Sequence, residues 1–169
     1  MRTLLLGSGQ VPRPGAAIVD ARASEGVNVV ADGRHLPFPD GVFLEIHVSA
    51  VLERTPDPFV VLDEIHRVLR STGRAEIRVP SPWSFRGPLA RTHVFAADLR
   101  LWREILEGYF DRVRVRPEGS RYRDSALLRG MTKLSIGLLG WHELADAWRF
   151  ECSDKLTLPQ RRDVPWPQA

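Results

Sequence analysis

The stretch Thr3-Leu4-Leu5-Leu6-Gly7-Ser8-Gly9 decides how this chain is expected to fold. A short apolar run that stops at a glycine turn is typical of a buried parallel strand whose end faces a ligand. Two more apolar runs follow, residues 16–19 and 27–31, and they end in Asp20 and Asp32. The first three strands are therefore expected to end in glycines or carboxylates.

Helix and strand patterns alternate along the rest of the chain. Apolar residues at helical spacing predict a helix over 58–69, with Asp57 as its N-cap and Gly73 after its end, and a second helix over 98–109. Further strands are predicted at 44–49, 75–79, around 113–115 and at 147–152. Residues 118–146 are expected to hold one or two helices, and the proline-rich residues 158–169 an extended or disordered tail.

This alternation predicts an α/β fold, a Rossmann-like open twisted sheet that is mostly parallel, in a single domain over residues 1–157. Ligands of such sheets bind beyond the carboxyl ends of the strands. The residues expected at or just after those ends are Gly7, Gly9, Asp20, Asp32 and Ser49. One edge of the sheet is thus the expected binding site.

Composition excludes several classes of protein. With 169 residues, 43% hydrophobic and 27% charged, the chain is expected to be one globular domain rather than disordered or fibrous. No apolar run approaches the ~20 residues that cross a bilayer, so a cytoplasmic protein without membrane contact is expected. The single Cys152 allows no internal disulfide, and the scattered histidines give no metal-ligand spacing.

The residues at the predicted edge favour a nucleoside as ligand. Glycines let a ligand lie against the backbone, and an acid at the end of the adjacent strand accepts hydrogen bonds from a ribose diol. Asp32, one strand further out, is placed to accept from an exocyclic amino group of adenine. Taken singly, each residue is also explained by a turn, a helix cap or a solvated loop.

Two further motifs carry a resemblance. Beside the glycine turn and the two acids stand Leu36-Pro37-Phe38-Pro39-Asp40 and Glu64-Ile65-His66-Arg67-Val68-Leu69-Arg70. Together they resemble class I S-adenosylmethionine-dependent methyltransferases, in particular a branch with an LPFPD-type turn. The resemblance implies a seven-stranded sheet with a reversed C-terminal strand hairpin, and S-adenosylmethionine as cofactor.

The same resemblance implies a role for each cofactor-binding residue. Gly7, Ser8 and Gly9 would lie along the methionine part of the cofactor, and Asp20 would bind the ribose hydroxyls. Asp32 and the backbone of Gly33 would face the adenine, and Ser49 would close the site at the end of the fourth strand.

Three departures from the family bear on activity. The sequence begins at the first strand, so the usual N-terminal helices are expected to be lacking. Residues 10–16 are too few and too rich in proline for the first crossover helix, whose dipole would favour the cofactor carboxylate. Arg54 stands where the branch commonly has a histidine. A catalytically inactive binding or regulatory module is therefore kept as an alternative.

A small molecule or metabolite is the expected methyl acceptor. The weak candidates for a general base are His47 and His93, since histidine titrates near neutral pH. An arginine run that includes Arg112, Arg114 and Arg116 would suit a nucleic-acid acceptor, but such runs are more often solvated, so an RNA methyltransferase stays an alternative that is not favoured. A homodimer is a further option, with the second copy supplying the lid.

Overall fold

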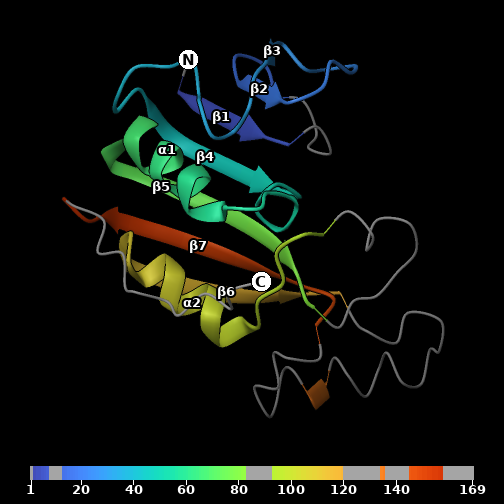
Figure 1. Ribbon diagram of the computed structural model, residues 1–169. Coiled ribbons are helices and arrows are strands. Elements are labelled where there is room, and N and C mark those ends of the chain that lie inside the picture. Colours follow the sequence, from blue (N-terminus) through green and yellow to red (C-terminus); the bar gives the residue numbers. More distant parts are fainter. Residues whose placement is uncertain (1, 8–12, 83–92, 120–133, 136–144, 158–169) are drawn as a thin grey trace.

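The computed structural model describes residues 2–7, 13–82, 93–119, 134–135 and 145–157. At its centre lies a seven-stranded sheet of order β3-β2-β1-β4-β5-β7-β6 (Figure 1). The strands are β1 (Thr3–Leu6), β2 (Ala17–Asp20), β3 (Val29–Val30), β4 (Phe43–Ser49), β5 (Leu69–Pro80), β6 (Phe110–Glu118) and β7 (Ala147–Lys155).

Strand directions follow the predicted pattern. The first five strands pair in parallel, and β7 runs antiparallel to both β5 and β6. The mostly parallel Rossmann-like sheet with a reversed C-terminal hairpin is therefore confirmed. Because the parallel strands share one direction, their carboxyl ends meet at one edge of the sheet.

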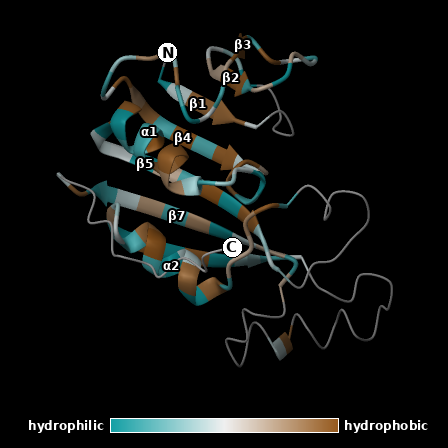
Figure 2. Cartoon of the chain, in the orientation of Figure 1, coloured by the Kyte–Doolittle hydropathy of each residue, from teal (hydrophilic) through white to brown (hydrophobic). Residues whose placement is uncertain are grey.

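Capping residues set where the two α-helices begin. In α1 (Pro58–Val68) the Asp57 carboxylate accepts the N–H of Phe59 at 3.0 Å, and Pro58 fills the first turn. In α2 (Leu99–Glu107) the Asp98 carboxylate accepts the N–H of Leu101 at 2.8 Å. Both helices carry apolar residues beside polar ones, as Figure 2 shows, and so can bury one side only.

The main core lies between the sheet and these helices. Leu62 and Ile65 of α1 and Trp102 of α2 belong to one buried cluster with Ile46 of β4 and Ile77 of β5. Figure 1 shows both helices in front of the sheet, α1 over β4 and β5 and α2 over β6 and β7. The opposite face has a small apolar cluster of Leu5, Ala16 and Ile18, and beyond β1 it turns polar.

Several predictions differ from the structure or lie outside its description. The chain passes directly from α1 into β5, so Gly73 lies inside a strand rather than after a helix. The predicted helices of 118–146 and the tail at 158–169 fall almost wholly outside the described residues. No helix in the described ranges is long and apolar enough to span a membrane.

Candidate functional site

A cavity of about 610 Å³ lies at the carboxyl edge of the parallel strands. Its size is within the roughly 300–1,000 Å³ common for small-molecule sites. It collects residues that follow four different strands, and those used below are Gly7, Asp20, Asp32, Gly33, Val51 and Arg54. The edge that the sequence predicted is thus hollow and open to a ligand.

Gly7 lies directly against the backbone at the end of β4. Its φ is +104°, and a Cβ built on it would stand 2.1 Å from the carbonyl oxygen of Ser49. Its N–H donates to the carbonyl of Val19 at 2.9 Å, which ties the turn to β2. A side chain here would therefore collide with the fold itself, so glycine is required by the protein as well as by any ligand.

The two acids lie on neighbouring strands beside this turn. Asp20 ends β2 and accepts the N–H of Arg22 at 3.0 Å, while its own carbonyl accepts the N–H of Ala31 at 3.0 Å. Asp32 follows β3, and Arg34 contacts both of its carboxylate oxygens, with the shortest contact at 2.6 Å. The guanidinium of Arg34 lowers the pKa of Asp32, which keeps that carboxylate ionised.

The end of β4 contributes backbone rather than the Ser49 side chain. Ser49 alternates with Glu45 and His47, which line a cavity on another part of the sheet, whereas Ala50 and Val51 line the cofactor-sized cavity. Ala50 has a φ of +57°, a left-handed conformation that costs energy for a residue with a Cβ. This strained turn redirects the chain along the edge of the cavity.

An arginine of α1 binds the LPFPD turn. Arg67 donates to Glu64 at 2.6 Å, to Asp40 at 2.7 Å and to the carbonyls of Phe38 and Leu36 at 2.8 and 3.1 Å. Glu64 in turn accepts the N–H of Leu36 at 2.7 Å. The two motifs that carried the resemblance are thus two halves of one hydrogen-bonded unit, which fixes the segment leaving Asp32 and Gly33.

His93 lies close to a buried carboxyl. Its Nε2 is 3.9 Å from Oε1 of Glu53, whose side chain is 5% exposed. Burial raises the pKa of Glu53, and burial together with the charge of Arg54 lowers the pKa of His93. Within the described part of the chain, Oε2 of Glu53 has no hydrogen-bond partner. Neither Glu53 nor His93 lines the cavity. Arg54, the neighbour of Glu53 in sequence, does line it.

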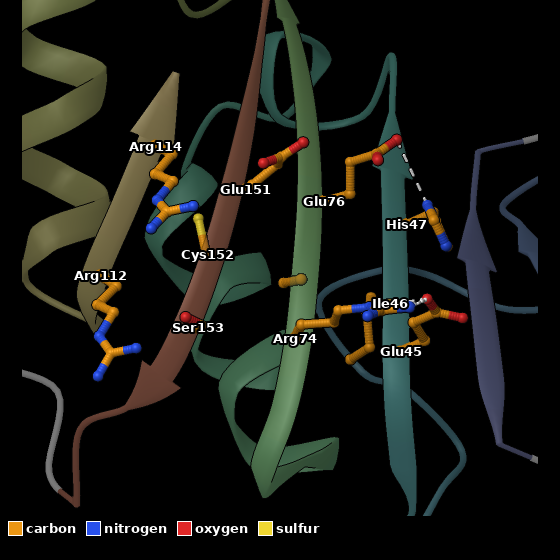
Figure 3. Close-up of a pocket in the computed structure, with 11 residues that line it drawn as sticks. Glu45, Ile46, His47, Arg74, Glu76, Arg112, Arg114, Glu151, Cys152 and Ser153 are labelled. Atoms are coloured by element: carbon orange, nitrogen blue, oxygen red, sulfur yellow. Dashed lines mark hydrogen bonds and ion pairs between the residues drawn. The ribbon is translucent and has the colours of Figure 1, made fainter. Parts of the chain in front are cut away.

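His47 lies in a second cavity, of about 430 Å³, on the polar face of the sheet. Figure 3 shows it beside Glu76, with Arg112 and Arg114 reaching in from β6. Its Nδ1 is 3.5 Å from a carboxylate oxygen of Glu76, and its Nε2 is 3.0 Å from a guanidinium nitrogen of Arg13. The structure therefore separates His47 from the nucleoside-sized cavity.

The predicted site residues thus divide into groups. Gly7, Asp20, Asp32 and Gly33 come together in one cavity, Ser49 reaches it only through its backbone contact with Gly7, and Ser8 and Gly9 lie outside the described residues. Sequence reasoning missed the lining by Arg22, Ala50, Val51 and Thr55, and noted Arg54 only as a departure. The one signal for these residues was their position just after a strand, β2 for Arg22 and β4 for the others.

Comparison with known proteins gives a consistent result. A family model described as a methyltransferase domain matches residues 13–77. A methyltransferase from Archaeoglobus fulgidus that depends on S-adenosylmethionine has a similar structure, with a TM-score of 0.62 and 17% identity over 90% of this chain and 85% of that one. No curated protein matches the sequence significantly.

Two other solved structures have similar folds. One, from Thermotoga maritima, is described as a possible histamine N-methyltransferase and has a TM-score of 0.62 and 14% identity over 91% of this chain and 82% of that one. The other is the [4+2]-cyclase SpnF, with a TM-score of 0.60 and 14% identity over 90% and 73%. At these identities the likeness concerns the fold alone.

Proposed function

We propose that this chain is a class I S-adenosylmethionine-dependent methyltransferase that transfers a methyl group to a small-molecule or metabolite acceptor in the cytoplasm, a proposal supported by the methyltransferase-domain match over residues 13–77 and by the similar folds of two such enzymes. One observation carries the proposal: a single cavity at the sheet edge gathers Gly7, Asp20, Asp32 and Gly33 from the ends of the first three strands. Each is a position at which the motif resemblance expects a cofactor contact.

The lining of that cavity fits the cofactor. The Asp20 carboxylate would accept the ribose hydroxyls, and Asp32, kept ionised by Arg34, would share its oxygens with the adenine amino group. A Cβ at Gly33 would make ordinary contacts of 3.6–3.7 Å with the side chains of Leu6, Val61 and Val51, so the fold itself does not require glycine at this position. The methionine part would lie along the backbone at Gly7.

The chain's main task in catalysis is alignment. When bound, the cofactor supplies a methyl group on a sulfonium, which is already activated for displacement. The strand ends hold the nucleoside, and the strained turn at Ala50 with Val51 forms the neighbouring wall. If the acceptor must lose a proton, His93 is the candidate we propose to receive it, because it lies 3.9 Å from Glu53, whose neighbour Arg54 lines the cavity, and because burial and the charge of Arg54 lower its pKa.

Ion pairing on β6 supports a small acceptor over RNA. Arg112 contacts Asp154 at 2.8 Å and Arg116 contacts Glu151 at 2.8 Å, so part of the arginine run is already neutralised. Salt-sensitive RNA binding that is lost on substituting these arginines would reverse this preference.

Calorimetry with S-adenosylmethionine and S-adenosylhomocysteine tests the proposal. We expect both to bind, and we expect Asp20→Asn to weaken each about tenfold, since hydrogen bonds to a charged acceptor contribute about 1.5–3 kcal/mol. The exposed Glu107→Gln is the control for loss of one negative charge. Absence of binding by the unaltered protein would overturn the proposal.

The alternative is a binding or regulatory module that has lost catalysis, which the short connection between β1 and β2 favours. An assay with S-adenosylmethionine that carries a labelled methyl group, and a panel of phenols, amines and carboxylic acids, distinguishes the enzyme from the module. Transfer of the label to any member of the panel would support the enzyme. Binding of the cofactor with no transfer to any acceptor would support the module.

A further inference from the structure

The sequence between β1 and β2 predicts no crossover helix, whose N-terminus would bring positive charge to this end of the cavity. Only nine residues, 8–16, separate Gly7 from Ala17, and two of them are prolines. The described part, 13–16, is a turn in which Ala16 donates its N–H to the carbonyl of Arg13 at 3.1 Å. A helix N-terminus at this place would attract an anionic group of a ligand.

Arg54 brings positive charge to the same cavity from a different element. It ends the short helix η1 (Leu52–Arg54), which follows the strained turn after β4, and it lines the cavity together with Gly7 and Val51. Its side chain is 38% exposed, so it is neither buried in the core nor fully solvated. An arginine fork suits a carboxylate, which it can bind through two parallel hydrogen bonds.

Arg54 is only weakly neutralised by the described residues around it. Among the described residues, its guanidinium pairs with Glu53, where Nε lies a long 4.0 Å from Oε1. Arg34 makes a contrast, since its guanidinium is bound to both oxygens of Asp32 at 2.6–3.1 Å.

We propose that Arg54 binds the carboxylate of the methionine part of the cofactor and so supplies positive charge at the place where a crossover helix would otherwise bring it. The inference rests on the proposed function and assigns one residue of that site. The place of the charge agrees with this assignment: Arg54 lines the cavity together with Gly7 and Val51, beside the turn along which the methionine part would lie.

Two ligands that differ in the methionine part test the assignment. S-adenosylhomocysteine carries the carboxylate, whereas 5′-methylthioadenosine keeps the adenosine and the sulfur and lacks it. We expect Arg54→Gln to weaken S-adenosylhomocysteine about tenfold in calorimetry and to leave 5′-methylthioadenosine within about twofold. Arg54→Lys should recover part of the loss, because it restores the charge but not the fork.

Arg22→Gln is the matched comparison, because Arg22 lines the same cavity beside Asp20. If it separates the two ligands as strongly as Arg54→Gln does, general charge rather than Arg54 is responsible and the assignment fails. The assignment also fails if Arg54→Gln weakens both ligands equally or neither. Failure of both ligands to bind the unaltered protein would instead overturn the proposed function, so the two failures are distinguishable.

Discussion

Replacement of Gly7 by alanine tests how closely β1 and β4 approach at the edge of the cavity. The new methyl carbon would stand 2.1 Å from the carbonyl oxygen of Ser49 and 3.2 Å from a methyl group of Val51. The oxygen belongs to the backbone of a paired strand and cannot rotate away. Relief of the contact therefore requires the two strand ends to separate, which also opens the wall of the cavity.

The loss of folding stability caused by Gly7→Ala has two parts. A φ of +104° is unfavourable for alanine by about 1–3 kcal/mol. Forcing a methyl group into a packed contact adds about 1–3 kcal/mol. Together they amount to about 2–6 kcal/mol, a large share of the roughly 5–15 kcal/mol that stabilise a typical domain. At about 2–4 °C per kcal/mol for a chain of this size, Tm should fall by about 10 °C.

Gly15→Ala separates the two parts in the same assay. Gly15 also has a positive φ, +78°, but a Cβ there meets nothing within 4 Å, so only the backbone strain should appear. Urea unfolding of both variants gives the difference directly, and we expect Gly7→Ala to be less stable than Gly15→Ala by about 2 kcal/mol. Equal losses, or a Gly7→Ala protein as stable as the original, would refute the close approach.

The other predictions concern the turn and the buried acid. Arg67→Ala should lower the free energy of unfolding by about 2 kcal/mol, because Glu64 loses its partner. The exposed Arg100→Ala is the control and should have little effect. Urea unfolding measures both. Glu53→Gln should raise stability by about 1 kcal/mol at pH 8. The folded protein binds the Glu53 proton more tightly than the unfolded chain, so this gain should shrink as pH falls toward 4.5, measured as Tm against pH. An unchanged gain at low pH would contradict the burial.

Much of the fold could be predicted because local patterns and tertiary packing agree. The apolar runs before Gly7, Asp20 and Asp32 are short and uninterrupted, as parallel strands covered by other elements require. Asp57 and Asp98 mark both helix starts, because their carboxylates accept N–H groups there. Gly73 was misread since a glycine after a helical pattern usually ends it, whereas here the helix ends at Val68 and the next residue already pairs with Phe43 of β4.

The candidate site was predictable only where it lies on strand ends. Parallel strands bring their carboxyl ends together whatever the side chains, so the positions of Gly7, Asp20 and Asp32 follow from topology. The positions of side chains that reach the cavity from irregular backbone do not follow from the topology. Arg54 depends on the left-handed turn at Ala50, and no periodic pattern in the sequence announces that conformation.

Within the described part of the chain, no helix covers the polar face of the sheet, and the charged side chains on that face explain why. On that face β4, β5, β6 and β7 present charged side chains at alternate positions, and neighbouring strands pair them as Arg74 with Glu45, Arg149 with Glu76 and Arg116 with Glu151. An apolar helix would have to desolvate these ions to pack there, at a cost that its own burial would not offset. The same alternation that turns His47 and Ser49 toward this face turns Ile46 and Val48 toward the core. A ligand therefore meets the sheet at its carboxyl edge, where backbone, carboxylates and Arg54 are exposed together.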